Sequence, residues 1–199
     1  MTILLARHAQ TDWNLEPARC QGWAEVEINA AGRDQARELG RGLVGRGIEL
    51  IVTSHLVRAR QTAELVHAQL GGELPLVVDP RLAETHRGEW ETRRFSSIIR
   101  DDPEGWARYR EHPETFRFPG GESLAAQQRR VLACLRDCAL DGRTALLVTH
   151  GGSIRLVRCF LEGAGLEAFH TGRTTNGGLE EVATDDLAGR IDVYLGRRS

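Results

Sequence analysis

Short apolar runs alternate along the chain with longer segments of helical periodicity. The apolar runs lack the strict alternation of a half-exposed strand, which is typical of parallel strands covered by helices on both faces. Four runs are predicted to be strands: TILLA (2–6), IELIVT (48–53), LPLVV (74–78) and TALLVT (144–149). Segments 55–70 and 122–139 each carry one apolar stripe and are predicted to be helices, and 30–39 also has a helical pattern. This alternation predicts an α/β fold with a mostly parallel sheet.

The last part of the chain has a different pattern. GGLEEVATDDLAGRIDVYLG (177–196) is typical of two strands around a turn near residues 185–189. The pattern predicts an antiparallel edge on the otherwise parallel sheet. The chain contains no internal repeat, low-complexity tract or linker-like stretch, so a single domain over residues 1–199 is expected.

Composition and charge narrow the class of protein. The chain has 199 residues, of which 41% are hydrophobic and 27% charged, as in ordinary globular proteins. Its 26 Lys+Arg and 28 Asp+Glu are interleaved and give a net charge of -2, so no nucleic-acid partner is expected. No apolar run approaches the ~18 residues of a membrane span, and the first run is too short for a signal peptide. A cytoplasmic protein with no membrane partner is expected.

The cysteines are predicted to be buried thiols rather than metal ligands or disulfides. None of them forms a C-x-x-C pair, and two lie four residues apart in a helical pattern, on one buried face. The four are Cys20, Cys134, Cys138 and Cys159. No metal site is expected from this pattern.

Three of the apolar runs end in a histidine. LLARH ends in His8, IVTSH in His55 and LLVTH in His150. In open α/β sheets ligands bind beyond the carboxyl ends of the strands, so three histidines there indicate a site, although each one alone is equally well a capping or loop residue. Arg7 favours the site, because a guanidinium at the end of a buried strand is costly unless it meets an anion.

Further groups suited to an anion follow the same strand ends. Arg58 lies in the first turn of the helix at 55–70, off its apolar stripe. THGGSIR resembles a strand, a glycine pair and a new helix, which leaves the N–H groups of Gly151 and Gly152 free for an anion. These features predict a phosphate pocket. Glu84 lies in the aperiodic loop RLAETHRGEWE, where position alone favours a solvated carboxylate.

A dinucleotide-binding motif is rejected. GRGLVG (40–45) spells G-x-G-x-x-G, but it follows a helical pattern and precedes a strand. The fingerprint requires the reverse order, with the glycines between a strand and the helix that follows it. These glycines are interpreted as a loosened helix end.

Six segments, in order along the chain, resemble motifs of one family. RHAQTDWN resembles RHG-x-[ST]-x-[WF]-N, SHLVRARQTA resembles S-x-L-x-R-A-x-Q-T-A, and LAETHRGEWE resembles the acid-bearing loop L-x-E-x-x-x-G-x-W-E. QGWAEVEINAAGRDQA, FPGGES and LLVTHGGSIR resemble three further motifs. Over nearly its whole length the chain thus resembles the histidine phosphatase superfamily, of phosphoglycerate-mutase-like fold, and most closely its α-ribazole phosphatase and broad-specificity branch.

The resemblance implies a fold and a chemistry. The fold is a three-layer α/β/α sandwich with a mostly parallel sheet and an antiparallel edge. The activity is hydrolysis of a small phosphomonoester, without metal or cofactor, through a phosphohistidine on His8. Arg7, Arg58 and His150 bind the phosphate, and Glu84 donates the proton, with a pKa that burial raises above its usual ~4.3. Four further residues match pocket positions of the family: Thr11, Asn14, Gln21 and Gly151.

Three positions depart from the family pattern. Ala9 replaces the usual glycine after the histidine, which bears on how closely the backbone approaches the phosphate. His55 replaces a usual proline, and Thr92 stands where many members carry glycine, near the entrance to the site. Activity is expected to survive the first two changes, and the sequence does not determine the effect of Thr92.

Two alternative functions remain at this stage. A cofactor-dependent phosphoglycerate mutase carries a longer segment after the acid loop than this chain does, which favours a phosphatase. A catalytically silent binding or scaffold domain is disfavoured. The nucleophile, the three phosphate-binding residues and the proton donor that the resemblance implies are all residue types capable of these roles. The aromatic residues of 101–118 form either a lid or a small local core. The expected partner is a small phosphorylated metabolite, and its identity and the choice between monomer and homodimer stay open.

Overall fold

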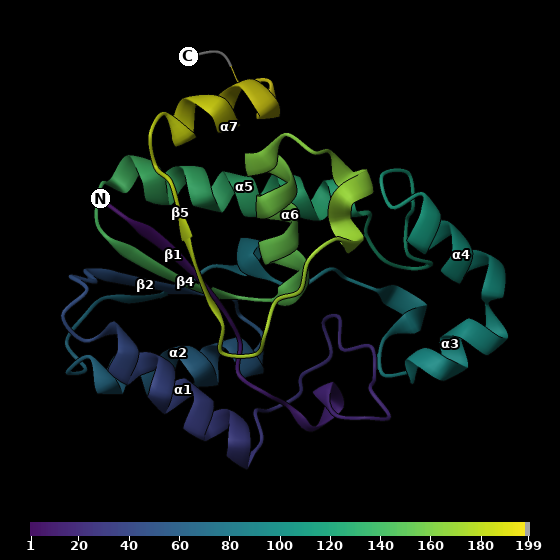
Figure 1. Ribbon diagram of the computed structural model, residues 1–199, viewed down its shortest axis with the longest axis horizontal. Coiled ribbons are helices and arrows are strands. Elements are labelled where there is room, and N and C mark those ends of the chain that lie inside the picture. The colour runs from purple at the N-terminus through teal and green to yellow at the C-terminus, as the bar shows by residue number, and fades with distance from the viewer. Residues whose placement is uncertain (198–199) are drawn as a thin grey trace.

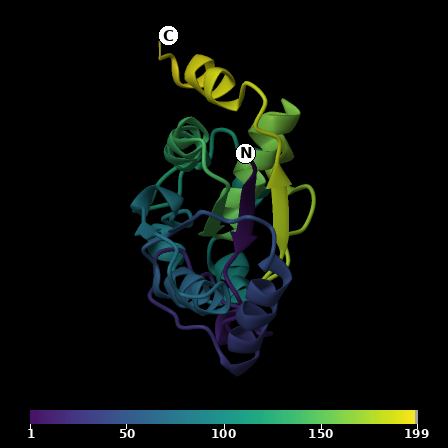
Figure 2. The same ribbon diagram turned by 90° about the vertical axis from the view of Figure 1, so that its left-hand side faces the viewer.

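Five strands form one mostly parallel sheet in the computed structural model, which describes residues 1–197 (Figure 1). The strands are β1 (Ile3–Arg7), β2 (Leu50–Thr53), β3 (Leu76–Val78), β4 (Ala145–Thr149) and β5 (Leu179–Val182). They lie in the order β3-β2-β4-β1-β5. Figure 2 shows β1 and β5 side by side and pointing in opposite directions, whereas all other pairs are parallel. The predicted α/β fold with an antiparallel edge is confirmed.

Helices cover both faces of the sheet and complete three layers (Figure 1). The helices on one face are α1 (Ala30–Leu43) and α2 (Val57–Gln69). Those on the other face are α5 (Leu124–Asp141), α6 (Gly151–Glu162) and α7 (Leu187–Leu195). Two short helices lie beyond one side of the sheet: α3 (Phe95–Asp101) and α4 (Pro103–Glu111). None of the helices that the structure describes is both long and apolar enough to span a bilayer.

The central strands are apolar throughout because each of their two faces enters a different core. In β1, Ile3 and Leu5 pack with residues of α5, α6 and α7, whereas Leu4 and Ala6 pack with residues of α1 and α2. Successive side chains of a strand point to opposite faces, so a strand covered on both sides needs an apolar residue at every position. This requirement explains why β1, β2 and β4 read as continuous apolar runs.

The glycines of the rejected dinucleotide motif lie in and just after α1. Gly40 is buried within this helix, where a Cβ atom would come 2.7 Å from Cβ of Gln69 and 3.2 Å from Cα of Val66. Glycine at this position therefore lets α1 and α2 pack closely. The helix continues to Leu43, four residues beyond the predicted segment that ended at 39, so Gly40 and Gly42 lie inside it and Gly45 follows it.

The prediction of two strands in the last segment is wrong in its second half. β5 pairs with β1 as expected, but residues 187–195 form the helix α7. Leu187 and Ile191 lie four residues apart and are buried among the side chains of α5 and α6. Val193, which favours a strand by propensity, is 81% exposed. The apolar stripe of this segment and its contact with α5 override the strand propensity of its exposed residues.

A second correction concerns β3. The run at 74–78 was expected to be a strand buried on both faces, but β3 is the outermost strand and contains only three residues. Val77 is 48% exposed and Val78 is 47% exposed. An edge strand has a neighbour on one side only, and here the helical layers do not extend far enough to cover it.

The aromatic residues between the acid loop and α5 form a local core rather than a lid. Trp90 is 1% exposed, and its ring lies 5.3 Å from that of Phe118 and 5.7 Å from that of Tyr109. Phe116 and the partly buried Trp106 belong to the same cluster, which also contains side chains of α3, α4 and α6. The four cysteines are free thiols and buried, as predicted.

Candidate active site

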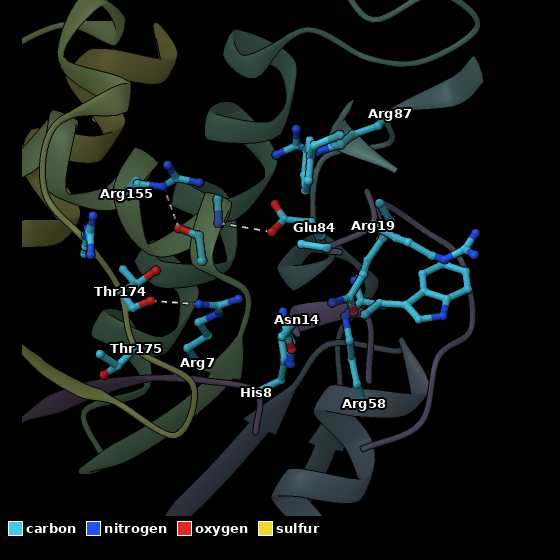
Figure 3. Close-up of a pocket in the computed structure, with 18 of the residues that line it drawn as sticks. Arg7, His8, Asn14, Arg19, Arg58, Glu84, Arg87, Arg155, Thr174 and Thr175 are labelled. Carbon is cyan, nitrogen blue, oxygen red and sulfur yellow. Dashed lines mark hydrogen bonds between the residues drawn. The ribbon is translucent and has the colours of Figure 1, made fainter. Parts of the chain in front are cut away.

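A cavity of about 360 Å³ opens at the carboxyl ends of β1 and β4. The residues that supply polar groups to its wall come from several distant segments of the chain (Figure 3). They are Arg7, His8, Asn14, Arg19, Gln21, Arg58, Glu84, Arg87, Gly151, Gly152, Arg155, Arg173, Thr174 and Thr175. The cavity lies where ligands bind in open α/β sheets, because β1 and β4 are central neighbours in this sheet.

His8 follows the last residue of β1 and is 3% exposed. Its backbone N–H donates to the carbonyl oxygen of Thr149, at 2.8 Å, which ties the residue to β4. Its ring Nδ1 lies 2.8 Å from the carbonyl oxygen of Ala9. A carbonyl oxygen only accepts, so Nδ1 carries the hydrogen and Nε2 keeps a free lone pair. Burial, and then the charges of Arg58 and Arg7, lower the pKa of His8 well below its usual value, so the ring is neutral.

His150 lies beside His8, with the ring centroids 5.2 Å apart. It follows β4 and is fully buried, and its Nε2 lies 2.9 Å from the hydroxyl oxygen of Ser54. The ring Nδ1 has no hydrogen-bond partner among the described residues. Burial and then the charge of Arg58 lower the pKa of His150 well below its usual value. A neutral ring can still donate one hydrogen bond.

Arg58 is fully buried and Arg7 is partly buried, and neither has a carboxylate within 4 Å in the part of the chain that the structure describes. A terminal nitrogen of Arg7 donates to the carbonyl oxygen of Thr174 at 2.7 Å. Arg58, in the first turn of α2, donates to the carbonyl oxygens of Ala24, at 2.9 Å, and Gly22, at 2.7 Å. In both guanidinium groups Nε has no partner within residues 1–197. Burial lowers the pKa of Arg58 to about 10, so it stays charged at neutral pH.

Glu84 projects into the cavity from the loop after β3 and is held by donors. Its Oε1 accepts from the N–H of Thr85 at 2.9 Å and from the amide of Gln127 at 3.3 Å, and its Oε2 accepts from the N–H of Gly152 at 3.1 Å. Burial alone would raise the pKa of this carboxyl, but the charge of Arg87 and the two backbone N–H groups outweigh it and lower the pKa to about 2. The expectation that burial raises the pKa of Glu84 is therefore wrong.

The glycine pair at the start of α6 is only partly free, which corrects the sequence interpretation. Gly152 is a glycine because a Cβ atom there would collide with the carboxylate of Glu84, to which its N–H donates. Gly151 lies on the cavity wall, where a Cβ atom would come 2.8 Å from Oγ1 of Thr174 and 3.3 Å from Nε of Arg7. The absence of a side chain at both positions keeps this wall of the cavity open.

The remaining predicted pocket residues form a small network beside His8. Asn14 and Gln21 line the cavity, whereas Thr11 is fully buried behind them. The hydroxyl of Thr11 accepts from the amide of Gln21 at 2.9 Å, and Oδ1 of Asn14 accepts from the N–H of Thr11 at 2.9 Å. The structure thus places Thr11 where it orients the other two, although the sequence assigned it to the pocket wall.

The histidines at the three strand ends do not all meet at the cavity. His8 and His150 lie together, but the His55 ring lies edge-on to Trp23, with the ring centroids 5.7 Å apart, and His55 is not part of the cavity wall. Trp23 donates from its indole N–H to the carbonyl oxygen of Glu84 at 2.7 Å. His55 therefore belongs to an aromatic contact outside the cavity that covers the acid loop.

Two of the departures from the family pattern have structural explanations. Ala9 is fully buried, and its methyl group packs with Ile28 and Ala36 while its N–H donates to Oγ1 of Thr62 at 3.0 Å. Thr92 has a φ of 67°, in the left-handed region that favours glycine and is strained for a β-branched residue. Its carbonyl oxygen accepts from Arg19 at 3.0 Å, so this turn holds a cation at the cavity wall.

Sequence reasoning did not find four arginines of the cavity wall: Arg19, Arg87, Arg155 and Arg173. Arg155 follows Gly151 by four residues on α6, a helical spacing that places both on one face and could have signalled its role. Arg87 follows Glu84 by three residues in an aperiodic loop, so no periodicity marks it. Within residues 1–197 no group of three or more His, Cys, Asp or Glu side chains is placed to hold a metal ion.

The fold and the site define an α/β enzyme with a cationic, histidine-containing cavity. The model of the histidine phosphatase superfamily (branch 1) matches residues 3–194, and the chain belongs to this superfamily. It is 37% identical over 154 residues to a protein of Enterobacter sp. (strain 638) named "Probable phosphoglycerate mutase", covering 76% of this chain and 70% of that protein.

Solved structures of similar fold include two phosphatases. A mycobacterial glucosyl-3-phosphoglycerate phosphatase superposes with a TM-score of 0.82 and 30% identity, covering 92% of each chain. An α-ribazole phosphatase from Shigella flexneri superposes with a TM-score of 0.82 and 26% identity, covering 92% of this chain and 90% of that one. The family identified from the sequence motifs is confirmed.

Proposed function

We propose that the protein hydrolyses a small phosphomonoester through a phosphohistidine on His8. The observation that supports this proposal is the set of nitrogen atoms in and around the His8 ring. Its Nε2 is free and neutral, and three buried nitrogens without partners in the described chain lie in the same site: Nε of Arg7, Nε of Arg58 and Nδ1 of His150. A phosphoryl group offers three non-bridging oxygens, so it suits such a set of donors.

The proposed reaction has two displacements at phosphorus. In the first, the lone pair of His8 Nε2 forms a bond to phosphorus while the bond from phosphorus to the ester oxygen breaks. Arg7, Arg58 and His150 donate to the non-bridging oxygens, where negative charge is concentrated. Glu84 in its acid form gives its proton to the departing oxygen. In the second, the oxygen of a water molecule forms a bond to phosphorus while the bond from phosphorus to Nε2 of His8 breaks and its electron pair returns to Nε2. Glu84 takes up one proton of this water, and phosphate is released.

The low pKa of Glu84 indicates how its proton arrives. The carboxyl of Glu84 is ionised at neutral pH, since its pKa is about 2. A phosphate ester loses its second proton near pH ~6, so a substrate monoanion brings a proton with it. Moving this proton to Glu84 leaves the phosphate as a dianion against Arg7 and Arg58, and the dianion in turn favours the neutral acid. The acid is thus formed on binding rather than by burial alone.

The reaction is proposed to need no metal ion, because side chains supply all the charge that faces the phosphate. Hydrolysis of p-nitrophenyl phosphate should therefore proceed at an unchanged rate after the protein is dialysed against EDTA and assayed in its presence. Loss of the rate in EDTA and its recovery with Mg²⁺ or Zn²⁺ would contradict the mechanism. Absence of hydrolysis under all conditions would instead favour a silent binding domain and overturn the proposed function.

A phosphoglycerate mutase is the second candidate, favoured by the name of the Enterobacter relative. A mutase keeps the phosphoryl group in a closed site and returns it to a second hydroxyl of the same substrate. Here the segment between the acid loop and α5 forms two short helices over a local aromatic core, and among its described residues Phe95 alone lines the cavity. Release of inorganic phosphate from 3-phosphoglycerate faster than formation of 2-phosphoglycerate supports hydrolysis, and the reverse order supports the mutase.

A further inference from the structure

The cavity carries more positive charge than a phosphate group requires. Its wall contains the six arginines Arg7, Arg19, Arg58, Arg87, Arg155 and Arg173 and a single carboxylate, that of Glu84. None of the six lies within 4 Å of a carboxylate in the part of the chain that the structure describes. The whole protein has a net charge of -2, so this cationic character belongs to the cavity and not to the surface in general.

Counting charges shows which arginines of the cavity wall have no anionic partner after the phosphate is bound. Arg7 and Arg58 together match the two charges of a phosphate dianion. The carboxylate of Glu84 offsets one further cation, and the charge of Arg87 is the largest favourable influence on its ionised form. Once Glu84 has taken up a proton, the four other arginines of the described wall, Arg19, Arg87, Arg155 and Arg173, lack an anionic counterpart there. Arg87 and Arg155 are the two of these four whose charges act on Glu84.

Arg87 is a buried cation that faces the cavity with most of its hydrogen-bonding capacity unused. It is 7% exposed, and its guanidinium carbon lies 5.1 Å from the ring centroid of Phe118 and 5.6 Å from that of Tyr109. Its only side-chain hydrogen bond within residues 1–197 is a 3.4 Å contact to the hydroxyl of Tyr109. A guanidinium has five N–H donors, and aromatic faces orient it without neutralising it.

Arg155 lies on α6, and its guanidinium is also held against an aromatic ring. Its guanidinium carbon lies 4.5 Å from the ring centroid of Phe169, and its Nε donates to the carbonyl oxygen of Gly151 at 3.2 Å. Figure 3 shows Arg155 to the left of Glu84 and Arg87 above and to the right of it, with His8 below. The alcohol part of a phosphomonoester leaves toward Glu84, and both arginines line the cavity close enough for their charges to act on the Glu84 carboxylate.

We propose that Arg87 and Arg155 form a second anion site, which binds a carboxylate or phosphate on the alcohol part of the substrate. This inference rests on the proposed function. It adds that the preferred substrates are phosphomonoesters with two anionic groups separated by a few carbon atoms. The second group supplies the missing counterpart to the two arginines and holds the ester oxygen beside Glu84.

Matched pairs of substrates test this site. 3-Phosphoglycerate differs from glycerol 3-phosphate by a carboxylate in place of a hydroxymethyl group, and propane-1,3-diol bisphosphate differs from 3-hydroxypropyl phosphate by a second phosphate. In at least one pair the anionic member should have the higher kcat/KM, by about 10- to 100-fold, as is typical of a hydrogen bond to a charged group. The pair that responds identifies the second group as a carboxylate or a phosphate.

Variants connect the preference to the two arginines. In Arg87→Gln and Arg155→Gln the ratio of kcat/KM within the responding pair should fall toward one, because each loses a cation that only the anionic member uses. Arg60→Gln is the matched control, since Arg60 is exposed on α2 and outside the cavity, and it should keep the wild-type ratio. If burial of Arg87 makes its variant unfold, as judged by circular dichroism, the less buried Arg155 decides the test.

The possible outcomes distinguish a failure of the second anion site from a failure of the proposed function. Hydrolysis of p-nitrophenyl phosphate together with ratios near one in both pairs overturns the second anion site and leaves the phosphatase proposal standing. A preference for the anionic member that persists unchanged in both arginine variants also overturns it. Absence of hydrolysis of every ester, the nitrophenyl compound included, overturns the proposed function instead.

Discussion

The His8→Ala variant should lose at least ~10⁴-fold in kcat on any phosphomonoester, because it lacks the atom that forms the covalent bond to phosphorus. With a ³²P-labelled substrate, rapidly quenched wild-type protein should carry label that is stable to base and lost in acid, the behaviour of a phosphohistidine. The variant should carry none. His150→Ala should turn over slowly yet still become labelled, since His150 binds the phosphoryl group without forming a bond to it.

His55→Ala is the matched control for this experiment. His55 also follows a strand, but it contacts Trp23 and is not part of the cavity wall, so its variant should keep both turnover and labelling near wild-type levels. Label that persists on His8→Ala would show that another residue is the nucleophile. Thermal denaturation of all three variants checks that the buried His8 position tolerates alanine.

The Glu84→Gln variant should distinguish between leaving groups. A general acid contributes ~10²- to 10⁴-fold only where the departing oxygen needs a proton. Hydrolysis of an alkyl phosphate, whose alkoxide leaves poorly, should fall by this factor, whereas the nitrophenyl ester, whose oxygen departs readily, should be affected much less. Single-turnover kinetics of the phosphorylation step exclude the later role of Glu84 as a base.

Two further variants serve as controls for the Glu84→Gln experiment. Arg58→Ala removes a phosphate ligand that every substrate uses, so it should slow both esters alike. Glu89→Gln is the matched carboxylate control, because Glu89 lies in the same loop but is exposed and outside the cavity. An equal effect of Glu84→Gln on both esters would make Glu84 a binding or structural residue, and a selective effect of Glu89→Gln would assign the acid there.

The sequence indicates the centre of the site because that centre lies at strand ends. His8, His150 and Arg7 each directly follow or end a buried apolar run, and the carboxyl ends of neighbouring parallel strands always meet. Arg58 could be placed beside them from its position in the first turn of a helix. Glu84 gave no such signal on its own, since a loop without periodicity does not fix the direction of a side chain, and only the resemblance to the family pointed to it.

The failures of prediction have tertiary causes. The α7 segment contains Ile191, Val193 and Tyr194, which favour a strand locally, and only its packing on α5 makes the helix the better choice. The low pKa of Glu84 depends on Arg87 and on the N–H of Gly152, which is 68 residues distant in the sequence. Arg87 in turn faces the cavity because aromatic residues of the segment after it hold its guanidinium.

The place of β1 between β4 and β5 has a consequence for the order in which the cavity forms during folding. β1 ends in Arg7 and is followed by His8, yet within the described residues it pairs with β4, which begins at Ala145, and with β5, which begins at Leu179. The carbonyl oxygen of His8 also accepts from Asn176 at 3.0 Å, and Arg7 donates to Thr174. The surroundings of His8 therefore form only when segments from distant parts of the described chain meet, so assembly of the cationic cavity is a slow, long-range step of folding.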